Sequence, residues 1–293
     1  MMQESRGREF LATLSERCQD LPFSPLILQD LFKATDASSM ASLEDVASII
    51  SRDQGLSARL LALANSAFYG LQSQVTSISR AAALLGVKEI RNLALLTGVK
   101  AMTEKHLPPD DFHLKDYWSH NLKVAVIAMD LDESCGFQEP QIVYTAGMLH
   151  DLGKLLTALY APEDWSAIQE LMEREGEPSH RAENAYWALE HGVVGSMALA
   201  AWNLPRELSE PVNWHHSPHL AKDLAKEAGL INLADLLSYH VSDEDQAVSE
   251  ALETALAPMA EEHEMLKDLE GYCDHLRERL TKEDVERMAC SLA

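Results

Sequence analysis

Hydrophobic residues recur every three or four positions along most of the chain, which is the spacing of an amphipathic helix. Leu11, Leu14 and Cys18 mark the first such helix, and Pro22 and Pro25 end it. Further on, Ser42 and Asp45 have the spacing of a capping box ahead of an apolar run. Val, Ile and Thr do not alternate with polar residues over a useful length, so no strand is predicted. The pattern therefore predicts an all-α protein.

A polar, proline-rich stretch interrupts this pattern near the middle of the chain. Residues 105–111, with the sequence KHLPPDD, disfavour a helix and mark a joint between two helical halves. We take the halves as residues 1–107 and 108–240, packed into one continuous body. The acidic tail, 241–293, is expected to add further helices. In the second half the pattern predicts helices over 114–131, 141–160, 162–175, 181–202, 205–215 and 221–240.

The charge balance disfavours several classes of partner. The chain has 293 residues, of which 46% are hydrophobic and 24% charged, as in ordinary packed proteins. Lys and Arg total 24 against 47 Asp and Glu, which gives a net charge of −23. Such a surface repels nucleic acid and anionic membranes but attracts cations. We therefore expect neither a nucleic-acid nor a membrane partner.

The sequence predicts neither a signal peptide nor a membrane-spanning segment. Residues 1–7 are polar, unlike a signal peptide, and no apolar run approaches the roughly 20 residues that span a bilayer. The four cysteines, Cys18, Cys135, Cys273 and Cys290, are scattered without a CxxC pair. Reduced thiols suit a chain of this kind. The expected compartment is the cytoplasm.

The dipeptide His150-Asp151 carries the most chemical information in the sequence. It supplies a nitrogen ligand beside a carboxylate that can bridge two cations. Lys154 follows one turn later on the same helical face, where it could neutralise a bound phosphate. Gly147 and Gly153 leave room for close approach. A His-Asp pair alone is more often a polar pair on the surface, so its meaning depends on the rest of the chain.

Five more ligand-type residues lie on apolar faces of the predicted helices. They are His120, His191, His215, His216 and Asp235. Each histidine alone is explained as a core residue satisfied by one hydrogen bond. Burying the whole set without partners is costly, and metal ligation removes that cost. We therefore interpret the set, with the His-Asp pair, as metal ligands. The other histidines lie in polar surroundings and need no special role: His106, His113, His180, His219, His240, His263 and His275.

Over residues 15 to 240 the chain resembles the HDOD family. The resemblance rests on IISRD at 49–53, ANSAFYG at 64–70, ISRAAALLG at 78–86, IRNL at 90–93 and WNLP at 202–205. It implies an all-helical regulatory module of bacterial signalling that acts through protein partners. The first half would be the interaction half, and the second an HD-like half with the metal site.

The ligand order also resembles that of HD-superfamily phosphohydrolases, the HD-GYP branch above all. By this resemblance His120, His150, Asp151 and Asp235 would hold one metal ion. Asp151 would bridge to a second ion held by His191, His215 and His216, and Lys154 matches the lysine of the HDxGK motif. Residues 215–219, HHSPH, lack the Gly-Tyr-Pro loop, which argues against cyclic-di-GMP hydrolysis. The resemblance favours iron, and mixed histidine and carboxylate ligands also suit manganese, zinc, nickel or cobalt.

Three functional hypotheses follow, and the first is favoured by the resemblance of the whole chain. The first is a regulatory module with a structural or sensory metal pair. The second is a metal-dependent phosphohydrolase acting on a phosphomonoester or a nucleotide-type phosphodiester, with Asp151 and Lys154 as catalytic residues; a pocket with cations facing the phosphate would support it. The third is DNA binding through residues 85–96, which offer Lys88 and Arg91 but also Glu89.

Overall fold

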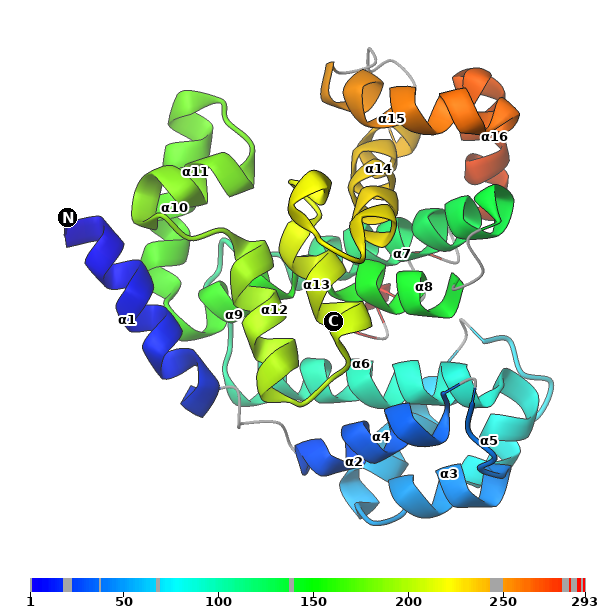
Figure 1. The fold of residues 1–293 in the computed structure, drawn as a ribbon. Helices are drawn as coiled ribbons and strands as arrows, with labels where there is room; N and C mark the ends of the chain where they lie inside the picture. The colour runs from blue at the N-terminus through cyan, green and yellow to red at the C-terminus, as the bar shows by residue number, and fades with distance from the viewer. Residues whose placement is uncertain are drawn as a thin grey trace.

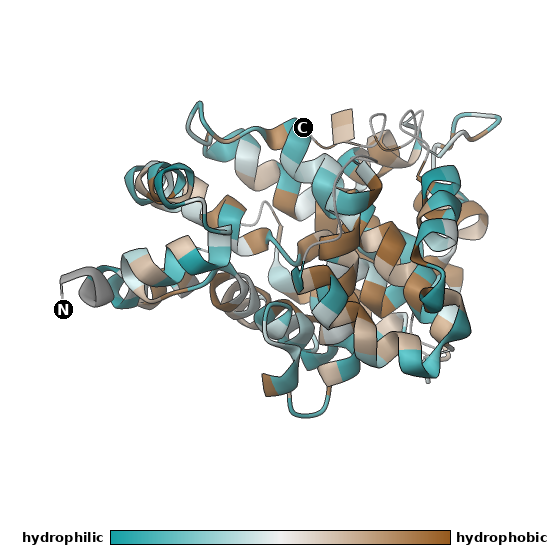
Figure 2. Ribbon diagram, turned by 90° about the horizontal axis from the view of Figure 1, so that it is seen from above, coloured by the Kyte–Doolittle hydropathy of each residue, from teal (hydrophilic) through white to brown (hydrophobic). Residues whose placement is uncertain are grey.

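The computed structural model describes residues 2–17, 23–36, 38–66, 69–136, 140–242, 250–280, 285, 289–290 and 292. Cys18, predicted to continue the first apolar face, lies outside them. The described residues form helices joined by turns and contain no strand, so the predicted all-α class is confirmed. In Figure 2 hydrophobic residues gather where helices face one another, and hydrophilic residues lie on the outer turns.

Helices α2 to α5 form one side of the molecule and pack against the long helix α6 (Figure 1). Their bounds are α2 (Pro25–Ala34), α3 (Leu43–Ile50), α4 (Gln54–Ala64), α5 (Ile78–Leu85) and α6 (Val87–Lys105). The predicted capping box is present: Ser42 accepts from the Asp45 amide, and Asp45 accepts from the Ser42 amide. The Asn65 side chain ties the loop after α4 to Val75 through two hydrogen bonds.

Eight helices of the second half form the frame of the candidate site. They are α7 (Leu114–Cys135), α8 (Pro140–Leu149), α9 (Leu152–Tyr160), α10 (Pro162–Glu175), α11 (Ser179–Trp187), α12 (His191–Ala201), α13 (Arg206–Trp214) and α14 (Ala225–Ser242). Helix α7 packs along α8 and α14, while α12 packs against α9 and α13. In Figure 1, α12 and α13 lie near the centre, between α9 on one side and α7 and α8 on the other, while α10 and α11 lie at the upper left.

Two helices predicted to be continuous are broken, and each break lies beside a candidate ligand. The predicted helix over 141–160 ends as α8 at Leu149 and restarts as α9 at Leu152. The one over 181–202 stops at Trp187 and restarts at His191, because Ala188 adopts a left-handed conformation with φ +56°. Alanine carries no sequence signal for that conformation, which favours glycine. Backbone irregularity of this kind is common at functional sites.

The two ends of the chain pack onto the second half. Helix α1 (Met2–Arg17) contacts α11 and α12, and Phe10 stacks on Trp187 with ring centroids 5.2 Å apart. The tail forms α15 (Glu250–Glu262) and α16 (Leu269–Arg279), in line with its predicted helical character. Tyr272 of α16 donates a hydrogen bond to the buried Asp130 of α7. The division at residues 107 and 240 stays a prediction.

The segment considered for DNA binding lies in the core. Arg91 is 4% exposed, and its guanidinium lies 4.5 Å from the centre of the Phe32 ring. A buried arginine that contacts an aromatic face cannot also reach a phosphate backbone. Arg91 is therefore not available to bind DNA. Among the described helices, none combines the length and the apolar character that crossing a bilayer requires.

Candidate metal centre

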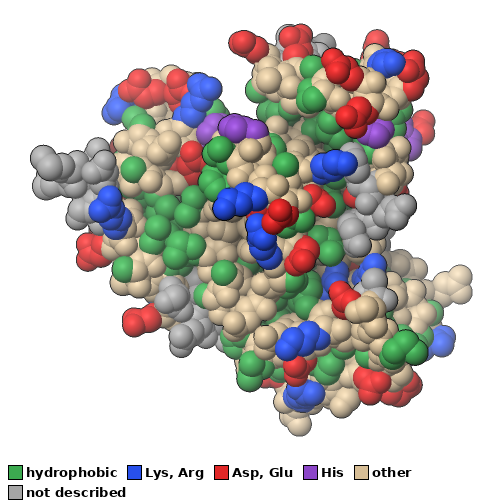
Figure 3. Space-filling view, viewed as in Figure 1, with side chains coloured by type: hydrophobic (Ala, Val, Ile, Leu, Met, Phe, Trp, Pro, Cys, Tyr) green, Lys and Arg blue, Asp and Glu red, His purple; other side chains and the backbone are tan. Residues whose placement is uncertain are grey.

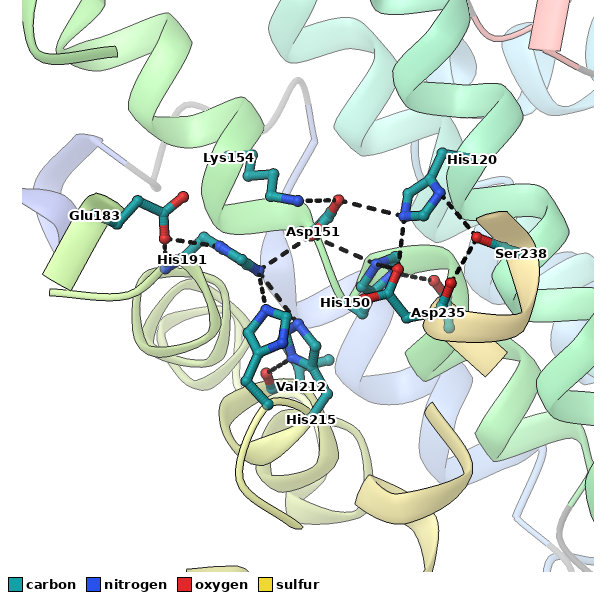
Figure 4. Close-up of polar contacts among 12 residues, drawn as sticks. His120, His150, Asp151, Lys154, Glu183, His191, Val212, His215, Asp235 and Ser238 are labelled. Carbon is teal, nitrogen blue, oxygen red and sulfur yellow. Dashed lines mark hydrogen bonds and ion pairs between the residues drawn. The ribbon is translucent and has the colours of Figure 1, made fainter. Parts of the chain in front are cut away.

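The seven predicted ligands meet in one buried cluster at the junction of α7, α8, α9, α12, α13 and α14 (Figure 4). Three overlapping groups have potential ligand atoms within 4.8 Å of one another. They are His120, His150 and Asp235; His191, His215 and His216; and His150, Asp151 and His215. The first two groups match the two predicted metal positions, and the third lies between them.

Asp151 occupies the centre because the chain turns there between α8 and α9. Its Oδ1 lies 3.4 Å from Nε2 of His150 and 3.1 Å from Nε2 of His191. Its Oδ2 lies 3.7 Å from Nε2 of His120 and accepts a hydrogen bond from Lys154 at 2.8 Å. The two carboxylate oxygens thus face different ligand groups. This is the arrangement that a bridging carboxylate requires.

The histidine rings are held with one nitrogen outward and the other toward the centre. Nδ1 of His150 donates to the carbonyl of Gly147 at 2.8 Å, and Nδ1 of His215 donates to that of Val212 at 2.7 Å. In a neutral ring this leaves Nε2 as an acceptor. Nε2 of His150 is buried and finds no hydrogen-bond donor among the described residues.

Three of the Nε2 atoms that face the centre lie within hydrogen-bond distance of one another, and each such contact requires a proton on one of the two rings. Nε2 of His191 lies 3.2 Å from that of His215 and 3.0 Å from that of His216. Oδ1 of Asp151 and Oδ1 of Asp235 are also buried without a hydrogen bond in the described part of the chain. Buried polar atoms are normally paired, and metal cations would pair all of these lone pairs at once. The residues present therefore fit a metal pair.

The electrostatics of the cluster keep most ligands in the form that metals bind. Burial lowers the pKa of His150. Burial and the charge of neighbouring histidines together lower the pKa values of His215 and His216 well below the usual value. Burial acts to raise the pKa of Asp151, but His150, Lys154 and His191 outweigh it and hold that pKa well below the usual value. Neutral imidazoles beside an ionised carboxylate are the forms that coordinate metal.

His191 differs from the other histidines because a second carboxylate lies behind it. Glu183 of α11 accepts hydrogen bonds from both the backbone amide and Nδ1 of His191, each at 2.7 Å, and is 4% exposed. Burial acts to lower the pKa of His191, but Glu183 outweighs it and raises that pKa to about 9. Carboxylates in this position orient metal-binding histidines and strengthen them as ligands.

Three residues at the site have no signal in the sequence. Glu183 lies eight residues before His191, beyond a helix break, so the helical period does not connect them. His180 was assigned to polar surroundings, yet it is half-buried and its ring stacks on that of His216 at 4.1 Å. Ser238 of α14 also lies at the site, with its Oγ 3.3 Å from Nδ1 of His120.

A glycine allows α9 to approach the start of α12. A Cβ built on Gly153 would lie 1.9 Å from the carbonyl oxygen of His191. Any side chain at position 153 would therefore displace the backbone of His191. We expect Gly153→Ala to lower the free energy of unfolding by about 3 kcal/mol or more, as overpacking does against rigid backbone. Gly229→Ala in α14 is the matched control, because its Cβ meets no described atom within 4 Å. Equal urea midpoints for the two variants would contradict this packing.

A groove of about 1260 Å³ opens the cluster to solvent. Lys154, His216 and Asp235 belong to its lining, and its walls come from α10 and α11 on one side and from α14 and α15 on the other. Figure 3 shows this hollow at the top of the molecule, between the parts formed by α10–α11 and α14–α15. The ligand cluster can therefore be reached by a small molecule.

Comparison with known sequences gives a family match over most of the chain. The model of the HDOD domain family matches residues 21–218, which include six of the seven predicted ligands and end short of Asp235. An uncharacterized protein of Treponema pallidum (strain Nichols) is 25% identical over 222 residues, which cover 75% of this chain and 42% of that protein. The chain thus spans less than half the length of this curated relative.

Solved structures share the fold across nearly the whole chain. A candidate phosphohydrolase from Shewanella amazonensis SB2B has a TM-score of 0.69 at 24% identity, over 96% of this chain and 98% of its own. An HDOD domain protein of unknown function from Geobacter sulfurreducens scores 0.67 at 23% identity, over 93% and 97%. A candidate signal transduction protein from Marinobacter aquaeolei VT8 scores 0.74 at 20% identity, over 99% and 66%. At these identities the likeness shows the fold.

Proposed function

The chain belongs to the HDOD family, and from this premise we propose that it is a regulatory module of bacterial signal transduction built around a dinuclear metal centre. The observation that carries the proposal is the convergence of seven imidazole and carboxylate side chains in three groups, within each of which the potential ligand atoms lie within 4.8 Å of one another. His120, His150 and Asp235 would hold one ion, and His191, His215 and His216 the other. Asp151 would bridge them.

Iron is the metal we propose for both positions, with manganese, zinc, nickel and cobalt as the alternatives that such ligands accept. Output would pass through contacts with signalling proteins, and we propose no nucleic-acid or membrane partner because of the net charge of −23. We place the protein in the cytoplasm. Cys135, Cys273 and Cys290 are free thiols, which suits a reducing compartment.

The groove supports a second candidate function, a metal-dependent phosphohydrolase. A metal pair would lower the pKa of a bound water and so supply a hydroxide nucleophile at neutral pH. Lys154 borders the groove, with its Nζ held on Oδ2 of Asp151 at 2.8 Å. From there its charge would stabilise the negative charge that grows on phosphoryl oxygens. Under this second function, a phosphate-containing ligand would be hydrolysed as a substrate rather than bound as a signal.

Turnover separates the two functions. We expect the metal-loaded protein to hydrolyse bis(p-nitrophenyl) phosphate and p-nitrophenyl phosphate no faster than Asp151→Asn does, because a regulatory module needs the centre for structure and binding. Nitrophenol release would be followed with each of the five metals. Multiple turnovers that disappear in both Asp151→Asn and Lys154→Met would replace the regulatory assignment by the hydrolase.

A further inference from the structure

We propose that helix α1 sets the affinity of the second metal position, the one formed by His191, His215 and His216, by holding the backbone just before His191. This inference rests on the proposed metal centre and adds a positioning element to it. Helix α1 spans Met2–Arg17, whereas the family model matches residues 21–218. The contact is therefore a feature of this chain beyond the part that the family model covers.

The backbone of α1 lies directly against the carbonyl that precedes the helix break. Gly7, Phe10 and Leu14 recur at helical spacing and are buried, so they form the face that α1 turns toward α11 and α12. A Cβ built on Gly7 would lie 2.5 Å from the carbonyl oxygen of Trp187 and 3.5 Å from Cβ of Leu189. Only glycine allows this approach, because any side chain at position 7 would push the two backbones apart.

Trp187 connects α1 to the turn that leads into α12. Its ring stacks on that of Phe10, and its Nε1 donates a hydrogen bond to the carbonyl of Leu189 at 2.8 Å. That bond spans Ala188, whose left-handed φ of +56° breaks the helix between α11 and α12. A left-handed alanine is strained, so neighbouring contacts must hold it in place. The indole and α1 supply those contacts.

The same turn fixes the position of His191 relative to Glu183. Glu183 lies four residues before Trp187 on α11 and accepts hydrogen bonds from Nδ1 and the backbone amide of His191, each at 2.7 Å. These two bonds join the end of α11 to the first residue of α12, so they depend on the shape of the turn between them. Release of α1 would loosen that turn, shift the carboxylate behind the ring and turn Nε2 of His191 away from the metal.

Further contacts fasten both ends of α1 to the helices on this side of the centre. Arg6 pairs with Asp164 of α10 at 2.7 Å, and Asp164 also accepts a hydrogen bond from Tyr186 at 2.9 Å. Arg17 donates to the carbonyl of Tyr160 at 2.5 Å, and the Tyr160 hydroxyl donates to the carbonyl of Arg17 at 3.2 Å. In Figure 1, α7 and α14, which carry ligands of the other metal position, lie on the far side of α12 from α1. We therefore expect α1 to affect one position and not the other.

Competition with a metal-sensitive dye on the full-length protein tests the inference. We expect Gly7→Ala to weaken the second metal position about tenfold and to leave the other unchanged, because the added Cβ pushes α1 away from Trp187. Trp187→Phe, which keeps the ring stack but removes the donor to Leu189, should weaken the same position. Arg8→Ala is the matched control, exposed on the same helix, and should leave both affinities unchanged. Equal weakening of both positions by Gly7→Ala, or of neither, would overturn the inference.

Hydrogen exchange followed by mass spectrometry tests the coupling in the wild type. Coupling between two sites is reciprocal, so metal at the second position must favour docked α1 as much as docking favours the metal. We expect the amides of α1 to exchange roughly tenfold more slowly in the metal-loaded protein than in the metal-free protein. In Glu183→Gln, at a metal concentration that fills only the other position, α1 should exchange at the metal-free rate. An exchange rate of α1 that does not respond to full metal loading overturns the inference, even if Gly7→Ala does not fold.

Metal content, measured first on each sample, separates this inference from the function on which it rests. Protein that binds metal at both positions while α1 is coupled to neither overturns the inference and leaves the proposed centre in place. Protein that takes up no metal overturns the proposed centre, and the inference falls with it.

Discussion

Chelation of the bound metal is expected to lower the melting temperature of the protein by roughly 10 °C or more. The physical reason is that seven buried or half-buried candidate ligands lose their common partner, and several of their polar atoms are then left without a hydrogen bond among the described residues. A site filled at a thousand times its Kd adds about 4 kcal/mol to the free energy of unfolding, and 1 kcal/mol shifts the melting temperature of a chain of this size by about 2–4 °C.

Differential scanning calorimetry before and after dialysis against a chelator measures this effect, and returning the metal should reverse it. The matched control is His113→Ala, which removes a histidine at the start of α7 outside the ligand cluster and should show the same metal-dependent shift as the wild type. In Asp151→Asn the shift should shrink sharply, because the bridging charge is lost. If neither the chelator nor the returned metal changed the melting temperature of the wild type, the centre would have no structural role.

Glu183→Gln is expected to weaken the metal position formed by His191, His215 and His216 by about 10–100-fold, the usual cost of losing the carboxylate behind a ligating histidine. Glu183 holds Nδ1 and the backbone amide of His191, so the substitution changes the charge behind the ring without touching the ligand atom. The position formed by His120, His150 and Asp235 should keep its affinity, because the hydrogen bonds and the ion pair of Glu183 within the described part of the chain go to His191.

Competition with a metal-sensitive dye resolves the two affinities in one titration. Glu177→Gln is the control from the same stretch of chain, because Glu177 is exposed and pairs with Arg181 at the surface. It should leave both affinities unchanged. Equal weakening of both positions by Glu183→Gln would mean that the carboxylate supports the fold in general rather than one ligand.

The fold class could be predicted from the sequence because the helical period is strong in nearly every segment. The inward direction of His120 follows from Val124 and Ile127 on the same face, and the structure buries that face. The helix breaks at His150-Asp151 and at Ala188 could not be predicted, because tertiary packing imposes them on residues that carry no turn signal. At these positions the needs of the site override local preference.

The sequence predicts the seven candidate ligands, and the structure brings them together, but the residues that support them carry no such signal. A glutamate such as Glu183 in a polar helix is normally a surface residue, and only the contact of α11 with the start of α12 buries it. His180 gains its place beside His216 in the same way. The groove cannot be read from any local pattern, because its walls come from helices far apart in the chain.

Elemental mass spectrometry of protein purified without oxygen or chelators tests the metal centre most directly. The wild type should be measured beside the double variant His150→Ala, Asp151→Ala, which removes one ligand and the bridge. We expect close to two transition-metal ions per wild-type chain, with iron the most abundant, and their loss from the double variant. A folded wild type that carries no transition metal, and takes none up when it is supplied, would contradict the account.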